Sequence, residues 1–177
     1  MFLRSHASPC PAGRGTGPLL QIFLLALWLS AGAAWATIDN VTLINADSDQ
    51  GFAGFDPIAE AATVVSGALP TDQWNLRANV NPGAASQVKS VKFILRLDGA
   101  DILTRVENVA PYAAYGDVSG DYNGAVFAPG SYELVVSSHT QPGAGGTRLD
   151  LDTLHFDVVE GGPSGPIQSL TLVDAVT

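Results

Sequence analysis

Cysteine and basic residues are scarce in this sequence. The only cysteine, Cys10, lies in an N-terminal segment that we expect to be removed, so the mature chain would hold neither disulfides nor thiolate metal sites. Arg4 and Arg14 lie in the same segment; without them, six Lys and Arg face 17 Asp and Glu, a net charge of about −11. Because binding to nucleic acid depends on Lys and Arg, we expect no nucleic-acid partner. A solvated acidic surface is sufficient to explain the charge.

Helical periodicity is also missing. No apolar i, i+3, i+4, i+7 pattern persists beyond about two turns, and Gly and Pro recur roughly every ten to fifteen residues. With 177 residues, 46% of them hydrophobic, the chain can fill a core. We therefore predict one all-β domain with appendages.

The N-terminus has the three parts of a secretory signal peptide. Two arginines precede a mostly apolar run at 19–29, and a small-residue ending, Ala34-x-Ala36, follows it. We place cleavage after Ala36, so that residues 1–36 form the leader. The alternative is an uncleaved anchor, but the run is shorter than the roughly 20 apolar residues that span a bilayer. The mature chain is expected outside the cytoplasm, free of the membrane, and its lack of cysteine suits a bacterium.

Alternating apolar and polar residues predict the strands of the domain. The clearest strands are 91–97 and 132–136, and weaker ones are expected at 38–45, 62–66, 74–80, 102–109 and 149–159. Asp98-Gly99 predicts a hairpin between 91–97 and 102–109. The sequence thus predicts about seven or eight strands within residues 37–161.

The last of these strands contains a phase slip. Leu149 and Leu151 share one parity, whereas Leu154, Phe156 and Val158 share the other. A one-residue bulge near Asp152 and Thr153 would return both sets to the core.

The C-terminal tail repeats the beginning of the domain. Residues 162–166 have the composition of a Gly/Pro linker, and 167–177 match 38–48 in residue type at nearly every position, at an offset of 129. Because repeats at domain-sized spacing indicate tandem modules, we interpret the tail as the start of a truncated second repeat. The alternative is an ordinary strand that completes the same sheet.

Several motifs occur in a characteristic order: Ser90-Val-Lys-Phe-Ile-Leu-Arg-Leu-Asp-Gly99, Val106-Glu-Asn-Val-Ala-Pro-Tyr-Ala-Ala-Tyr-Gly-Asp117, Gly120-Asp-Tyr122 and Gly130-Ser-Tyr-Glu-Leu134. Together they resemble an immunoglobulin-like repeat module of large secreted bacterial multidomain proteins. The resemblance implies an immunoglobulin-like two-sheet antiparallel sandwich, an extracellular or cell-surface setting and neighbouring modules. It implies no catalytic residues.

Tyr132 also resembles the tyrosine corner of immunoglobulin-like sandwiches. We expect its hydroxyl to bond to backbone just upstream, and the strand containing Phe93 to occupy the centre of the opposite sheet.

The loop at 108–124 holds the candidate binding residues. Its tyrosines, with Trp74 and Phe127, would make an aromatic platform for sugar rings if they were exposed; the alternative is that all of them pack. The residues selected for binding are Tyr112, Tyr115, Asp117, Asp121 and Tyr122.

Oxygen-bearing residues between Asp117 and Asn123 are spaced as in a calcium loop, and Asp47, Asp49 and Asp56 form a second acidic group. The positions that an EF-hand-like loop gives to Gly and Glu hold Tyr122 and Ala128, so we interpret these carboxylates as turn caps and predict no metal and no cofactor. A calcium site would require Asp117, Asp121 and the second group to converge.

No catalytic motif is present in the expected mature chain. Neither His139 nor His155 has a ligand partner at metal spacing, and no serine lies in a G-x-S-x-G sequence. The expected function is therefore a non-catalytic secreted or cell-surface module with a structural or adhesive role. The alternative is a carbohydrate-binding accessory domain that uses the Tyr112 to Tyr122 loop. The expected partner is an unidentified protein or glycan at the cell surface.

Overall fold

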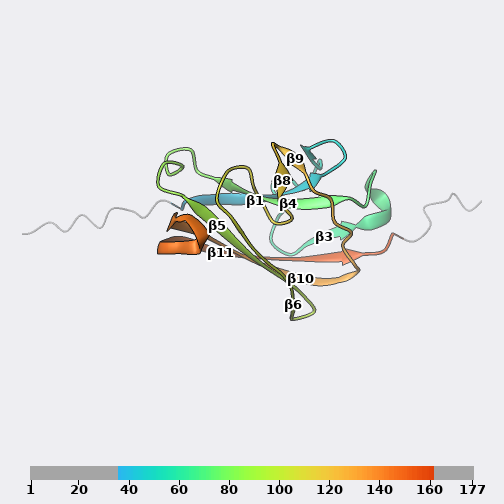
Figure 1. Cartoon of the computed structure of the whole chain (residues 1–177). Coiled ribbons are helices and arrows are strands. Elements are labelled where there is room, and N and C mark those ends of the chain that lie inside the picture. Colours follow the sequence, from blue (N-terminus) through green and yellow to red (C-terminus); the bar gives the residue numbers. More distant parts are fainter. Residues whose placement is uncertain (1–35, 162–177) are drawn as a thin grey trace, which may run out of the picture. The chain divides into compact units, whose positions relative to one another are not determined.

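The computed structural model describes residues 36–161, which form an all-β sandwich of two facing sheets (Figure 1). This confirms the predicted all-β sandwich. One sheet has four strands, in the order β2 (Gln50–Gly51), β1 (Ile38–Asn45), β4 (Trp74–Val80) and β7 (Tyr112–Ala113). The other has five, in the order β3 (Ala62–Val65), β11 (Gly145–Val159), β10 (Gly130–Gln141), β5 (Ser90–Leu97) and β6 (Ala100–Glu107).

The shorter elements lie in the connections. A hairpin of β8 (Asp117–Val118) and β9 (Asp121–Tyr122) belongs to neither large sheet, and two 3-10 turns span Ser66–Ala68 and Pro142–Ala144. Within residues 36–161 no helix is long and apolar enough to cross a membrane. The predicted leader, apart from Ala36, and the linker and repeat-like tail lie outside the described residues.

The core lies between the sheets, where alternate side chains of each strand meet. On β5, Val91, Phe93 and Leu95 are fully buried, as period-two alternation requires. The other sheet contributes an equivalent row, and the residues buried there and on β10 and β11 include Val41, Leu43, Trp74, Leu76, Ala78, Leu134, Val136, Phe156 and Val158.

The hairpin and the tyrosine corner agree with the sequence. Asp98 and Gly99 have positive φ values of 51° and 83°, as a two-residue hairpin turn between β5 and β6 requires. The Tyr132 hydroxyl donates to the carbonyl oxygen of Ala128 at 2.8 Å. Both predictions are therefore confirmed.

The position predicted for the strand of Phe93 is wrong. β5 does not lie opposite the strand of Tyr132 but pairs with it, from Tyr132 opposite Leu97 to His139 opposite Ser90. Cross-strand pairing along β10 thus places the two clearest strands of the sequence side by side in one sheet.

The predicted bulge in the last strand is also misplaced. β11 pairs with β10 without interruption from Val158 to Asp150, and the register shifts between Asp150 and Arg148, at Leu149. Leu149 packs against the core, whereas Leu151 remains 48% exposed on the outer face. The strand therefore tolerates an exposed leucine instead of a bulge at Asp152 and Thr153.

Candidate functional site around the 108–124 loop

A buried asparagine holds the 108–124 loop against the four-stranded sheet. Asn75 of β4 has no exposed surface, and its side-chain amide donates to the carbonyl oxygens of Gly116 at 3.0 Å and Asn123 at 2.9 Å. Its side-chain oxygen accepts from the backbone N–H groups of Tyr115 at 3.1 Å and Leu76 at 2.8 Å. The amide therefore makes all four hydrogen bonds available to it.

Nothing in the sequence indicates this role of Asn75. Alternation along β4 directs Asn75 away from the core between the sheets, where a solvated side chain is the usual expectation. The loop that buries it lies about forty residues further along the chain. Only the tertiary structure shows that the outer face of this sheet is covered.

The loop tyrosines pack and do not form an exposed platform. Tyr112 and Tyr122 are only 8% and 7% exposed, and Tyr122 packs with Ile44 and Ala113 in a small second core outside the four-stranded sheet. Tyr115 is half-buried, with its ring 5.6 Å from that of Phe127. Burial raises the pKa of both Tyr112 and Tyr115. The structure therefore favours packing of the tyrosines over the exposed platform that the sequence left open.

Trp74 and Phe127, the other proposed platform residues, are core side chains. Trp74 is 1% exposed and Phe127 is 5% exposed. Their rings lie 5.6 Å apart, and the Trp74 indole N–H donates to the carbonyl oxygen of Thr71. This arrangement satisfies the only polar atom of the tryptophan.

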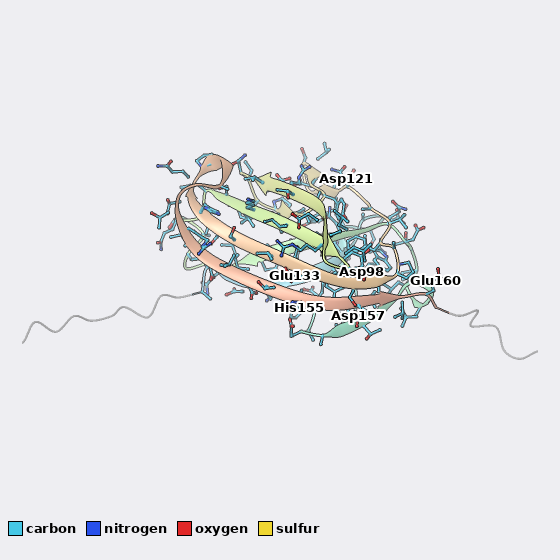
Figure 2. All side chains as sticks on the ribbon, turned by 90° about the horizontal axis from the view of Figure 1, so that it is seen from below. Asp98, Asp121, Glu133, His155, Asp157 and Glu160 are labelled. Atoms are coloured by element: carbon cyan, nitrogen blue, oxygen red, sulfur yellow. The ribbon has the colours of Figure 1, made fainter. Side chains whose placement is uncertain are left out.

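The acidic residues of the candidate site make hydrogen bonds in turns. Asp117 accepts from the N–H of Gly120 at 2.6 Å and closes the β8–β9 turn, in which Ser119 and Gly120 have positive φ. Asp49 accepts from the N–H of Tyr122 at 2.8 Å and ties the 46–50 turn to the same hairpin. Asp121 is exposed (Figure 2).

The convergence that a calcium site would require does not occur. Within residues 36–161, no group of three or more His, Cys, Asp or Glu side chains is arranged to hold a metal ion. Asp56 accepts a hydrogen bond from the hydroxyl of Thr42, on β1.

A hollow of about 410 Å³ lies beside the loop, over the end of β4. Arg77 lines it together with Asn79, Val80, Ala85, Ala110, Pro111, Tyr112 and Tyr122. The Arg77 Nε donates to the Asn79 side-chain oxygen at 2.8 Å. Arg77 takes part in none of the ion pairs formed between side chains of residues 36–161. Its guanidinium can therefore bind an anionic group, which is the chemistry arginine favours.

A row of charged side chains crosses the outer face of the five-stranded sheet. Arg96 of β5 pairs with Asp101 of β6 at 2.6 Å and with Glu133 of β10. His155 of β11 lies next to Glu133, at 3.6 Å, and pairs with Glu60 at 2.8 Å (Figure 2). The row alternates in charge when His155 is protonated, as cross-strand pairing favours.

Hydrogen bonding to Glu60 raises the pKa of His155, and the nearby charges of Glu60 and Glu133 add to this effect. The pKa of Glu60 is lowered, mainly because its carboxylate accepts a hydrogen bond from the backbone N–H of His155. Ala61 also donates its N–H to the carbonyl oxygen of His155. Together these contacts hold the segment that precedes β3 against strand β11. His155 is thus a surface strand residue, as the sequence indicated.

The candidate binding residues therefore lie together, but most of them serve the packing of the loop. A scan against protein-family models found no match to this chain, and searches of curated proteins and of solved structures also found none.

Proposed function

We propose that residues 37–161 form a non-catalytic, secreted or cell-surface module with a structural or adhesive role, built as an immunoglobulin-like sandwich within a series of modules. The order β11-β10-β5-β6 corresponds to strands G-F-C-C′ of that fold, and β1-β4-β7 corresponds to A-B-E. The tyrosine corner at the start of β10 supports the same assignment.

The observation that carries the structural role is the position of the two ends of the domain. The chain enters at Thr37, whose N–H bonds to Asp150 near the start of the straight part of β11, and leaves after Val159, at the other end of that strand (Figure 1). The extended strand from Asp150 to Val159 spans about 30 Å. Entry and exit at opposite ends allow modules to follow one another head to tail, with each module adding to the length of the array.

The polar side chains that hold the 108–124 loop support the same proposal. Asn75, Asp117 and Asp49 use their polar atoms to fix the loop, and two of its three tyrosines are buried. A loop fixed in this way stiffens the outer face of a sheet, which suits a spacer.

The proposal is tested by small-angle scattering on two copies of residues 37–161 joined by residues 162–166, with one copy as the control. Head-to-tail modules increase the maximum dimension by at least about 30 Å. Two copies that dock side by side leave the maximum dimension almost unchanged and contradict the proposal. Export is tested separately, by fractionation of a secreting bacterial host that expresses the full chain.

The hollow at Arg77 favours a second candidate function, the binding of an acidic glycan at the cell surface. Among residues 36–161 no carboxylate forms an ion pair with the Arg77 guanidinium, although the chain is strongly acidic. Tyr112, Tyr122 and Pro111 supply apolar walls. The carboxylate of a sugar acid matches the planar, bidentate geometry of arginine. This candidate uses the hollow beside the loop, not the exposed tyrosine faces of the alternative drawn from the sequence.

Calorimetric titration with oligosaccharides of uronic acids and with neutral oligosaccharides of equal length tests this candidate. Arg77→Gln is expected to abolish binding of the acidic sugars, whereas Arg148→Gln, on exposed β11 sequence, leaves it unchanged. Equal binding of neutral and acidic sugars, or the absence of any binding, would contradict it.

A further inference from the structure

Thr37, the residue before β1, lies in a mostly buried site in which both its backbone N–H and its hydroxyl are hydrogen-bonded. Thr37 is only 6% exposed, although the preceding Ala36 is exposed. The Thr37 N–H donates to Oδ2 of Asp150 at 2.8 Å, and the Ile38 N–H donates to the same oxygen at 3.1 Å. The Thr37 hydroxyl also bonds to the hydroxyl of Ser138, which has no exposed surface.

We propose that this site receives the α-ammonium group of Thr37 after the leader is removed, with Asp150 as its counter-ion. The inference rests on the proposed export, because cleavage after Ala36 makes Thr37 the first residue. Hydrolysis of the Ala36–Thr37 bond consumes one water: its oxygen enters the new carboxylate of Ala36, and both its hydrogens end on the Thr37 nitrogen. A neutral amide donor thereby becomes a cation at the same position.

The surroundings of Asp150 suit a cationic partner. Its side chain is partly buried, and no Lys, Arg or His side chain of residues 36–161 forms an ion pair with it. Among the donors of residues 36–161, its other oxygen, Oδ1, accepts only from the N–H of Leu151, at 2.9 Å. A carboxylate has about four acceptor positions, so the additional hydrogens of an ammonium can be accommodated. Charge-assisted hydrogen bonds are roughly twice as strong as neutral ones.

Burial also sets the order of events. Proteases cleave exposed backbone, whereas the N–H of Thr37 is bonded and its side chain is enclosed in the folded domain. Cleavage therefore comes before the first strand docks, and the charge that cleavage creates strengthens the docked state.

A melting-temperature cycle on the purified chain tests the contact. One form consists of residues 37–177 with a free Thr37 amine, released from a cleavable fusion, and the other retains residues 30–36, so that the free amine lies seven residues upstream. Each is made with Asp150 and with Asp150→Asn, which keeps an acceptor for the two N–H groups but removes the charge. We expect the substitution to lower the melting temperature by about 4 °C or more in the form that begins at Thr37, and by less than half as much in the longer form.

Asp152→Asn is the matched control. Asp152 is exposed on the same strand, and within the described part of the chain its side chain accepts only from the N–H of Thr153. This substitution should lower the melting temperatures of the two forms by the same small amount. An equal loss from Asp150→Asn in both forms would overturn the proposed ammonium site.

Mass spectrometry of the chain recovered from a secreting host separates this inference from the proposed export. A mature chain that begins at Thr37 supports both. A different first residue overturns the ammonium site while leaving export intact. A chain that keeps its leader inside the cell overturns the proposed export and removes the source of the amine, even if the melting cycle shows that the contact forms in vitro.

Discussion

The rings of Tyr132 and Phe156 stack almost in parallel, with centroids 5.0 Å apart and an angle of 6° between their planes. They are cross-strand partners on β10 and β11. Tyr132 also contacts Phe127, which contacts Trp74, which in turn contacts Phe52. A continuous series of aromatic rings therefore joins the five-stranded sheet to the four-stranded sheet through the core.

Phe156→Ala should lower the free energy of unfolding by about 3–5 kcal/mol, because it leaves a cavity beneath Tyr132. Urea unfolding followed by tryptophan fluorescence measures the change. Leu151→Ala, on the exposed face of the same strand, is the control and should change stability by no more than about 0.5 kcal/mol. Comparable losses in the two variants would contradict the assignment of inner and outer faces of β11.

Tyr132 should ionise well above the ordinary tyrosine range in the native protein. Burial raises its pKa to about 12, with Tyr115 and Asp98 adding to the effect and the bond to Ala128 opposing it. The neutral phenol is favoured by folding, so its contribution to stability is complete below the unfolded pKa of about 10 and is lost as the pH rises through the folded pKa.

An ultraviolet absorbance titration between pH 9 and pH 12.5 measures this difference, with Tyr132→Phe identifying the late-titrating group. The same variant should lose about 1–2 kcal/mol of stability at neutral pH, because the carbonyl of Ala128 loses its donor. A titration in which all tyrosines ionise together near the ordinary tyrosine value, while the protein remains folded, would contradict the burial of Tyr132.

Asn75→Ala should destabilise the domain by about 3 kcal/mol, since two loop carbonyl oxygens and two N–H groups lose their partner in a buried place. Amide hydrogen exchange should show that the loss of amide protection is concentrated in residues 108–124. Asn81→Ala is the control, because Asn81 is partly exposed and its side chain serves a turn and a surface contact to Asp39. An unchanged loop in the Asn75 variant would mean that side-chain packing alone holds it.

The pair of His155 and Glu60 should contribute to stability mainly between pH 4.5 and pH 6.5. The pKa of His155 is raised, so its contribution is complete below its unfolded value of 6.5 and is lost as the pH rises through the folded pKa. The pKa of Glu60 is lowered, so its contribution is complete above 4.5 and is lost as the pH falls through the folded pKa.

The comparison of wild type with His155→Gln at pH 5.5 and pH 8.5 tests this window. Both side chains are exposed, so the difference in melting temperature should be small, larger at pH 5.5, and reduced by salt. A difference that grows with pH would contradict the assigned sign.

The amino-acid sequence was sufficient for the β class, for the positions of most strands and for two local devices. Alternation along 91–97 indicates that every second residue is buried. The Asp98-Gly99 turn and the Tyr132 corner depend on residues close in sequence. Such signals are local because backbone conformation and side-chain period are set by near neighbours.

Only the tertiary structure determined which residues of the candidate site are buried. Asn75 and Ile44 lie on strand positions that point away from the main core, and they are buried because the 108–124 loop folds over them. The parallel pairing of β3 with β11 and the bulge at Leu149 likewise depend on strands distant in sequence. Side-chain periodicity shows which face of a strand a residue occupies, but only long-range contacts determine whether that face is covered or meets water.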